Sequence, residues 1–398
     1  MAADPVVIAV VLATFGLLFF RQIRVYPLTR SITAATGAVT VIALGAISPE
    51  EALRSIDSET ILLLFGMLAH VEALSRSDFY SWAAAQLVRR TGTVRRLVIG
   101  TLWLAAILSA LALNDAIVLL MTPVLIQAVR NAEADATGPL VAVILGANIG
   151  SVATPLGNPQ NAYILSQSGF TTLEFVSVLG PIAVVSLVVT SVILAIQHSG
   201  TPIESTVSVP DIDRRWAVSS SAFLIGTFVL MAAIPTVPAG IIAAGTGVCH
   251  LAWLQLFRRL PGEEILATMD WGILVLFVGL FVLVGSVRDT VLVESLQQVG
   301  SGLGLAGVTF VLSNLVSNVP AVVLLSTAVS DPTGWYLLAA VSTLAGNATP
   351  IASAATLIVL DQASRRGVDL SVVDLVRIGL PIAVVTSTLA TTILLVAR

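Results

Sequence analysis

The chain has 398 residues, of which 57% are hydrophobic and only 11% are charged, and its mean hydropathy is +0.99. Soluble domains carry about 25% charged residues, so this composition excludes an ordinary soluble protein and indicates several spans in a lipid bilayer. The single cysteine, Cys249, excludes an internal disulfide and a cysteine-based metal cluster, and we expect neither a metal nor a cofactor. No basic patch typical of nucleic-acid binding is present, and the net charge of −4 indicates no particular partner.

Apolar runs of about 20 residues predict the membrane-spanning helices. In the first half these runs are 5–20, 28–47, 60–75, 97–130, 140–168 and 175–197, with an amphipathic stretch before residue 97. Residues 198–215 are polar and contain Pro202 and Pro210, which predicts a central linker. In the second half the runs are 216–234, 239–257, 271–287, 303–329, 335–364 and 375–397, with an amphipathic stretch before residue 300.

Four of these runs are interrupted by polar or helix-breaking residues. The interruptions are Asn114-Asp115, the segment from Thr154 to Asn161, Asn318-Val319-Pro320 and Thr349-Pro350. Proline removes a backbone donor and glycine lowers helix stability, so such segments break a helix. Backbone groups freed at membrane depth must line an enclosed or watery cavity. Broken helices are therefore the best indication in the sequence of a transporter's binding site.

The two halves of the chain resemble each other. The matched segments and residues are Ser109…Asn114 with Ser313…Asn318, Ala153-Thr154-Pro155 with Ala348-Thr349-Pro350, Pro181…Val185 with Pro381…Val385, Asp57 with Asp270, and Gly66 with Gly279. Because the matches occur in the same order and at nearly constant spacing, they indicate an internal duplication.

The positions of the arginines indicate how the two halves cross the membrane. If the interrupted runs 97–130 and 303–329 are re-entrant hairpins, each half crosses five times and the halves are inverted. With both termini outside, 16 of the 19 basic residues then lie inside, and only Arg54, Arg288 and Arg398 lie outside. This strong positive-inside bias favours the hairpins over an arrangement in which both runs span the membrane.

The predicted fold class is therefore an all-α polytopic membrane protein of two inverted repeats. Each repeat has five transmembrane helices, one of them broken at the midplane, and one re-entrant hairpin. Residues 1–197 form the first repeat, residues 198–215 the linker, and residues 216–398 the second repeat.

Asp115 is the most informative ionisable residue of the interrupted runs. An acidic residue in a membrane-embedded segment is rare and marks an ion or proton pathway. The alternative interpretation is that the tip reaches water and that Asp115 only caps the following helix. Thr154 and Thr349 also have two interpretations. Their recurrence at both breaks favours lining the site, and the alternative is that they bond freed backbone groups.

Other polar residues are expected to be structural. His70 and Glu72 lie two residues apart and face different sides of a helix, and Glu72 is expected to pair with Arg76. Asp57 and Asp270 precede spans and are expected to start helices.

None of the four interruptions contains an arginine, so we expect no strong fixed positive charge for a multivalent anion. Helix N-termini in the site suit an anion or a polyhydroxylated neutral solute, whereas carbonyl, Asn and Ser oxygens suit a small cation. The chain lacks the sequence patterns of hydrolases and of P-loop ATPases, so enzyme activity is not expected. A separate soluble ATPase partner stays an open alternative.

The motifs Asn114-Asp115-Ala116, Ala147…Asn161, Ser313…Pro320 and Gly346…Ala355 resemble those of the ion transporter superfamily, and within it those of the arsenite efflux permease and related anion permeases. The resemblance covers nearly the whole chain. It implies a scaffold of about residues 1–75 and 216–287, a mobile transport part of about residues 97–168 and 303–364, elevator-type motion and a homodimer.

The resemblance also implies binding residues at the tips and breaks. Where the sodium-coupled dicarboxylate branch has Ser-Asn-Thr tips, this chain has Leu-Asn-Asp at Asn114 and Ser-Asn-Val at Asn318, which are more similar to the proton-exchanging arsenite permeases. The expected substrate- and ion-binding residues are Ser109, Asn114, Asp115, Thr154, Gly157, Asn158, Asn161, Ser313, Ser317, Asn318, Thr349, Ala352 and Ser353.

The expected function is secondary active transport of an inorganic anion or metalloid, of the arsenite or antimonite efflux type, by proton antiport through Asp115 with elevator-type alternating access. The alternatives are sodium-coupled uptake of a di- or tricarboxylate or an inorganic anion, sodium/proton antiport, and a passive channel. The expected location is the plasma (inner) membrane, with many passes and both termini outside.

Overall fold

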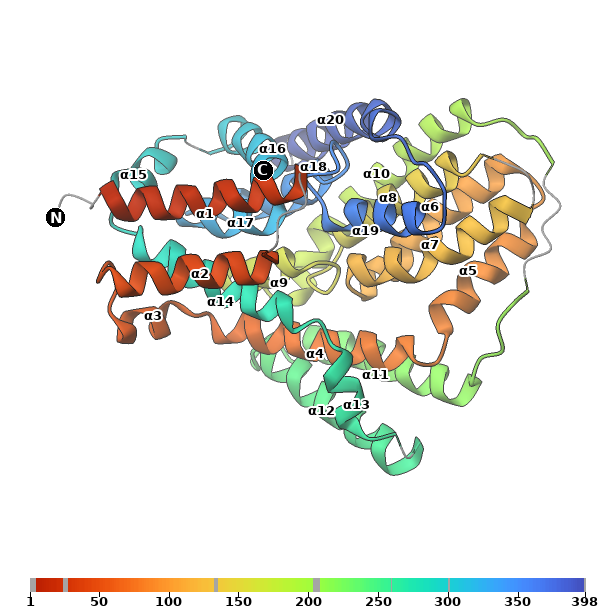
Figure 1. Cartoon of the computed structure of the whole chain (residues 1–398), viewed down its shortest axis with the longest axis horizontal. Coiled ribbons are helices and arrows are strands. Elements are labelled where there is room, and N and C mark those ends of the chain that lie inside the picture. Colours follow the sequence, from red (N-terminus) through yellow and green to blue (C-terminus); the bar gives the residue numbers. More distant parts are fainter. Residues whose placement is uncertain are drawn as a thin grey trace.

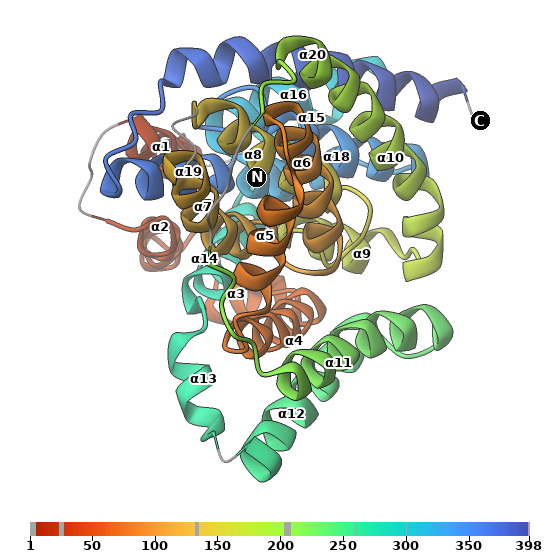
Figure 2. The ribbon, with the colours of Figure 1, turned by 90° about the vertical axis from the view of Figure 1, so that its right-hand side faces the viewer.

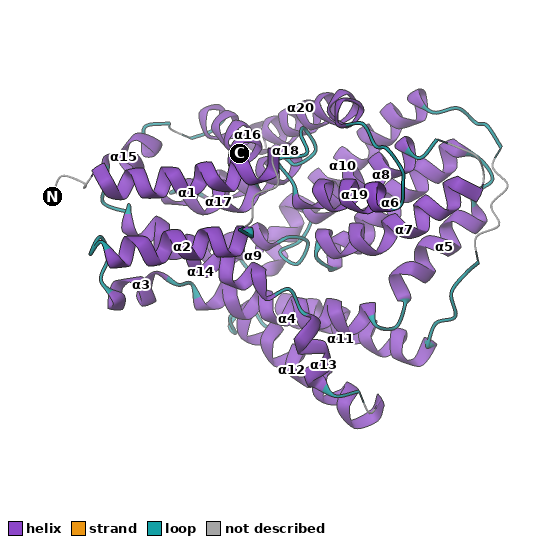
Figure 3. Ribbon diagram, in the orientation of Figure 1, coloured by secondary structure: helices purple, strands orange, loops and turns teal. Residues whose placement is uncertain are grey.

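The computed structural model describes residues 5–23, 28–131, 135–202, 208–258, 260–299 and 301–396. Within these ranges the chain is built of helices and loops without a β-strand (Figure 3). The prediction of an all-helical membrane protein is confirmed. Arg24, Arg259 and Arg398, three of the residues used to orient the chain, lie outside the described residues.

The first half of the described chain forms a series of helices. They are α1 (Pro5–Ile23), α2 (Arg30–Ala43), α3 (Pro49–Ser55), α4 (Ser58–Ser75), α5 (Phe79–Arg90), α6 (Val94–Leu111), α7 (Asn114–Asn131), α8 (Thr137–Ser151), α9 (Pro159–Ser168) and α10 (Thr172–Gln197).

The second half repeats this order of long and short helices. Its helices are α11 (Arg214–Ala233), α12 (Ala239–Arg258), α13 (Gly262–Thr268), α14 (Trp271–Ser286), α15 (Val291–Gln297), α16 (Leu303–Val316), α17 (Asn318–Leu325), the 3-10 turn η1 (Ser326–Ala328), α18 (Pro332–Ala345), α19 (Ala354–Arg365) and α20 (Val372–Val396). The repetition agrees with a duplication, whereas the inversion of the two halves stays a prediction.

The short helices α3 and α13 precede spans and were not predicted, because seven residues are too few to give a clear hydrophobic period. A local signal for α3 did exist. The Ser48 side chain accepts from the backbone nitrogen of Glu51, and the Glu51 carboxylate accepts from that of Ser48, so together they form a capping box.

Six of the described helices are long and apolar enough to cross a membrane singly, namely α4, α6, α10, α11, α12 and α20. The pair α13 and α14, bent by 57°, counts as a seventh span if taken together. The shorter apolar helices include α8, α16 and α17, which belong to the interrupted runs. The chain is therefore an integral membrane protein, and the number of crossings stays a prediction.

The interrupted runs divide where the sequence predicts. Helices α6 and α7 meet at Ala112 and Leu113, and α16 and α17 meet at Ser317; the two arms pack on each other in each case. Both broken runs separate into two helices, α8 with α9 and α18 with α19, joined by the Thr-Pro segments. The breaks thus bring several helix ends into the interior of the molecule (Figure 1).

The predicted scaffold is held by two helix pairs that repeat each other. Helix α4 packs on α12, and α2 packs on α14 (Figure 1). Within each pair the matched glycine, Gly66 or Gly279, makes the closest approach. A Cβ on Gly66 would overlap the backbone carbonyl of Ala243, and one on Gly279 would lie 2.7 Å from the backbone carbon of Ala34. Helices α11, α12 and α13 project from the rest of the molecule (Figure 2).

Each described end of the central linker is hydrogen-bonded to a neighbouring helix. The backbone nitrogen of Val94 donates to Thr201 O at 3.0 Å, which fixes the start of the linker beside α6. At its far end, Asp213 caps α11 and accepts from Arg258 at 2.6 Å. The backbone N–H of Trp216 and the Arg258 guanidinium hold the pKa of Asp213 below its usual value.

Candidate functional site

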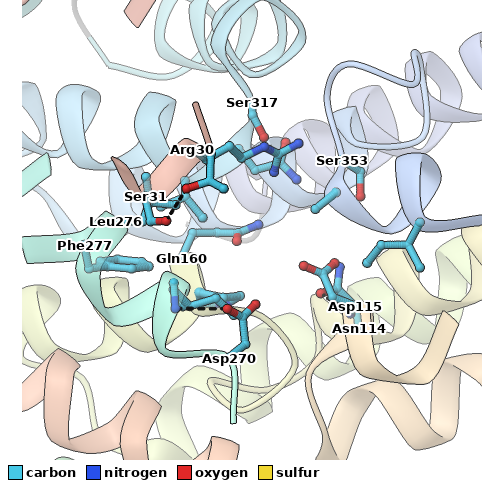
Figure 4. Close-up of a pocket in the computed structure, with 18 of the residues that line it drawn as sticks. Arg30, Ser31, Asn114, Asp115, Gln160, Asp270, Leu276, Phe277, Ser317 and Ser353 are labelled. Carbon is cyan, nitrogen blue, oxygen red and sulfur yellow. Dashed lines mark hydrogen bonds between the residues drawn. The ribbon is translucent and has the colours of Figure 1, made fainter. Parts of the chain in front are cut away.

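A polar cavity of about 420 Å³ lies where the tips and breaks converge (Figure 4). Six helices line it, and each does so with residues at or beside its N-terminal end. These are Thr29, Arg30 and Ser31 of α2, Asn114 and Asp115 of α7, Pro159 and Gln160 of α9, Asp270, Gly272, Ile273, Leu276 and Phe277 of α14, Ser317, Asn318 and Val319 of α17, and Ala352, Ser353, Ala354 and Ile358 of α19. Helix N-termini carry free N–H groups and the positive end of the helix dipole, so the cavity favours anionic or oxygen-rich groups.

Three charged side chains lie in this cavity. Asp115 lies on one side with Asn114, Arg30 lies across from it near Ser317, and Asp270 lies below Arg30 in the view (Figure 4). The cavity thus combines one guanidinium group with two carboxyl groups.

Amide side chains connect the first hairpin tip to both breaks. Asn114 Nδ2 donates to Asn148 Oδ1 at 3.1 Å, and Asn148 Nδ2 donates to Asn347 Oδ1 at 2.9 Å. The Asn114 backbone nitrogen also donates to Gly157 O at 3.0 Å. The tip of the first hairpin is therefore fixed to the breaks of both halves.

The second tip is fixed in a similar way. Ser317 Oγ donates to Ala352 O at 3.2 Å. In the amide orientation that satisfies its neighbours, Asn318 donates to Ser342 O at 2.9 Å and to Ala352 O at 3.0 Å. Ser317 has φ of 77°, in the region that favours glycine, and such backbone strain is concentrated at functional sites.

Six of the thirteen expected binding residues line the cavity. They are Asn114, Asp115, Ser317, Asn318, Ala352 and Ser353. The structure shows that these six residues line the same cavity. The binding role of all thirteen residues stays a prediction.

The other seven expected residues lie outside the cavity lining: Ser109, Thr154, Gly157, Asn158, Asn161, Ser313 and Thr349. In the first half, several of them bond protein groups of the tip and break. Ser109 Oγ donates to Ala147 O at 2.7 Å, Thr154 Oγ1 donates to Ala110 O, and Asn158 caps α9. For Thr154 this contact agrees with the alternative interpretation, in which its hydroxyl bonds a freed backbone group.

Of the remaining residues outside the cavity lining, Asn161 bonds a backbone carbonyl and Thr349 bonds a side chain. Asn161 Nδ2 donates to Ser151 O at 2.9 Å, and Thr349 Oγ1 donates to Asn314 Oδ1 at 2.8 Å. Gly157 allows close packing, since a Cβ there would lie 2.5 Å from Ser151 Cα. Ser313 differs, because its buried hydroxyl has no hydrogen-bond partner among the described residues.

Sequence reasoning missed Arg30, Gln160, Asp270 and Phe277 as cavity residues. Asp270 does start α14 as expected, because its carboxylate accepts from the Gly272 nitrogen at 3.0 Å, but it also lines the cavity. The expectation that no arginine serves the site was based on the four interruptions, whereas Arg30 reaches the cavity from α2. Two features of the sequence could have pointed to these residues. Gln160 lies inside a break motif, and Asp270 is matched to Asp57 in the other half.

Comparisons with known proteins agree with this architecture. The family described as "Citrate transporter" matches residues 7–345. The "46 kDa membrane protein" of Mycobacterium leprae is 27% identical and covers 97% of this chain and 96% of its own. The "Silicon efflux transporter LSI3" of Oryza sativa subsp. japonica is 26% identical and covers 91% of each.

A solved structure has the same fold. The YdaH transporter of Alcanivorax borkumensis, described as having an unusual topology, superposes with a TM-score of 0.53 and 16% sequence identity. The superposition covers 86% of both chains.

Proposed function

Because the chain belongs to the citrate transporter family within the ion transporter superfamily, we propose that it is a secondary active transporter of a small inorganic anion or metalloid hydroxide. The solute class that we favour is arsenite or antimonite, exported in exchange for protons. Membership of this family identifies the chain as a membrane transporter. The identity of the solute and of the coupling ion is our proposal.

The observation that carries this proposal is the placement of Asp115. Its carboxyl group lies in a cavity formed by six helix N-termini, opposite Arg30 and close to Asp270. Helix N-termini and Arg30 suit oxygen ligands, whereas two carboxyl groups disfavour a multivalent anion. A small hydroxylated acid that is neutral at pH 7, such as arsenous acid, fits this balance. A relative named for silicon efflux supports the same class, because silicic acid is also small, neutral and polyhydroxylated.

In the proposed cycle Asp115 takes up a proton on one side of the membrane and releases it on the other. Protonation removes a negative charge from the cavity, and solute binding and proton binding then alternate. A mobile transport part carries the tips and breaks past the scaffold in an elevator-type motion. We place the protein in the plasma (inner) membrane as a homodimer with both termini outside. A proton gradient drives this cycle without a soluble ATPase.

The test is uptake of radiolabelled arsenite by everted vesicles, first under an imposed pH gradient and then under a sodium gradient. We expect accumulation driven by the pH gradient and lost in Asp115→Asn. The matched control is Asp369→Asn, which changes an exposed aspartate outside the cavity and should transport normally. Full pH-driven transport by Asp115→Asn would remove the proton role, and no arsenite movement under either gradient would reject the solute.

A second candidate function is sodium-coupled uptake of a di- or tricarboxylate. The position of Arg30 in the cavity favours it, because a guanidinium binds carboxylates bidentately. The same vesicles separate the two candidates: uptake of radiolabelled citrate driven by sodium, without arsenite transport, would favour the second.

A further inference from the structure

A second polar cavity lies along the same helices as the candidate site. Its volume is about 750 Å³. It is lined by Arg54, Ser55, Ile56, Asp57, Ser58, Tyr163, Gln167, Phe281, Val284, Gly285, Arg288, Asp289, Val293, Gln297, Val323, Ser326, Thr327, Val329 and Trp335. We call it the distal cavity. Most of these side chains are polar or charged, although the cavity lies within a molecule of very apolar composition.

Three helices line both cavities, always in the same order. The first turns of α9, α14 and α17 line the candidate site. Later residues of α9 and α14 line the distal cavity, as do the end of α17 and the turn η1 that follows it. In α14, for example, Phe277 lines the site and Phe281 lines the distal cavity. Because a helix rises about 1.5 Å per residue, the two spaces lie about one to two turns apart along these helices.

Three aromatic rings lie between the two cavities. The ring centroids of Tyr163 and Phe281 are 5.4 Å apart, those of Phe277 and Phe281 are 5.7 Å apart, and those of Tyr163 and Phe277 are 6.4 Å apart. All three side chains are buried. The Tyr163 hydroxyl lies 2.7 Å from Ser326 Oγ, which holds the tyrosine against η1. These close-packed rings place an apolar surface between the two polar spaces.

The internal duplication relates the two cavities. Asp270 at the start of α14 lines the candidate site, and its match Asp57 at the start of α4 lines the distal cavity. Arg54 and Arg288, the two described arginines that the charge bias places outside, both line the distal cavity. Arg30, which the same bias places inside, lines the candidate site. Equivalent scaffold positions thus line spaces that are expected to face opposite sides of the membrane.

We propose that the distal cavity is the vestibule of the opposite membrane face, through which the same small polar solute enters or leaves, and that Tyr163, Phe277 and Phe281 form the barrier between the two. This inference depends on the proposed transport function for its solute but not for its geometry. Tyr163 belongs to α9 of the expected transport part, whereas both phenylalanines belong to α14 of the expected scaffold. The barrier therefore lies at the boundary along which the two parts slide.

The two cavities can be tested by accessibility, without any solute. In a Cys249→Ser background, Ser31→Cys reports the candidate site and Ser58→Cys reports the distal cavity, each with a change of one atom. A membrane-impermeant maleimide is applied to spheroplasts and to inside-out vesicles. We expect Ser58→Cys to react in spheroplasts and Ser31→Cys in inside-out vesicles. Reaction of both from the same side would overturn the proposal, even if arsenite transport is established.

The barrier is tested by proton leak in proteoliposomes that hold an imposed pH gradient and no solute. We expect Tyr163→Ala and Phe281→Ala to dissipate the gradient several-fold faster than the unsubstituted protein. Tyr163→Phe is the control, because it keeps the ring and loses only the hydroxyl contact to Ser326. Folding of each variant is checked by its elution as a single peak in detergent. Folded alanine variants that hold the gradient would show that the rings are not the barrier. That result would leave the arsenite test of the transport function unaffected.

Discussion

The Ser353 hydroxyl donates to Asn148 Oδ1 at 3.1 Å, and this contact between the halves has a counterpart in which Asn158 Nδ2 donates to Thr343 Oγ1 at 3.3 Å. Ser353 and Asn158 occupy the N-cap positions of α19 and α9, and each pair of counterparts lies 195 residues apart, as do the two Thr-Pro motifs. Each broken helix is thus held by the first arm of the other half. These reciprocal contacts join the broken helices of the two halves, and the proposed elevator-type motion requires that they move as one unit.

Asn148 is the residue on which most of these contacts depend. Replacing it with alanine leaves the side chains of Asn114, Asn347 and Ser353 without their partner in a fully buried position. Each buried polar group that loses its partner costs about 1–3 kcal/mol. We therefore expect Asn148→Ala to lower the melting temperature in detergent clearly. Gln298→Ala, at an exposed residue, should not. An Asn148→Ala protein as stable as the control would show that the amide contacts contribute little.

Alanine substitutions at glycines of the predicted scaffold are expected to lower the stability of the protein by different amounts. Gly66→Ala places a methyl group on the Ala243 carbonyl, and Gly279→Ala places one 2.7 Å from the Ala34 backbone. Overpacking of this kind costs about 1–3 kcal/mol. We expect both variants to be less stable, and Gly66→Ala the more so. Gly226→Ala on α11 meets open space and should be neutral or stabilising, because alanine favours helix. Thermal unfolding of the three proteins gives the order, and an equal loss in all three would contradict it.

The sequence predicts the breaks well because the signal is local. Pro155 and Pro350 lie in the breaks between two helices, Pro159 begins α9, and Asn114 and Asn318 begin α7 and α17 as the interruptions indicate. The pairing of Glu72 with Arg76 is likewise local, and it is confirmed at 3.3 Å. These features depend on residues within one or two turns of each other.

The composition of the cavity could not be predicted in the same way. Arg30 begins α2, and its own neighbours give no reason to place it opposite Asp115, which lies 85 residues later. Asp270 starts a helix as expected, and its second role depends on α14 packing beside α2. Contacts of this kind arise from tertiary packing, which a single sequence does not specify.

Two buried histidines form another contact that depends on tertiary packing, and this contact gives a further prediction. His70 Nδ1 lies 3.0 Å from His250 Nδ1, and His250 Nε2 lies 2.8 Å from Ser220 Oγ. One imidazole must donate to the other, so removing either ring leaves a buried nitrogen without a partner. We expect His70→Phe and His250→Phe to destabilise the protein singly and the double variant to cost less than their sum. The coupling should be about 0.5–1.5 kcal/mol, the worth of one hydrogen bond. A double-mutant cycle from unfolding in detergent measures it, and strictly additive losses would contradict the shared bond.

Arg30 separates the two classes of solute. A guanidinium bound to a charged oxygen contributes about 1.5–3 kcal/mol, which corresponds to about a tenfold to hundredfold change in affinity. If the solute is a carboxylate, Arg30→Gln should raise KM by that amount. If it is neutral arsenous acid, we expect less than a tenfold rise. The measurement is the concentration dependence of arsenite and citrate uptake into everted vesicles. Arg89→Gln, on the exposed end of α5, controls for loss of a positive charge elsewhere. A large rise in KM for arsenite at pH 7 would show that the transported species is an anion.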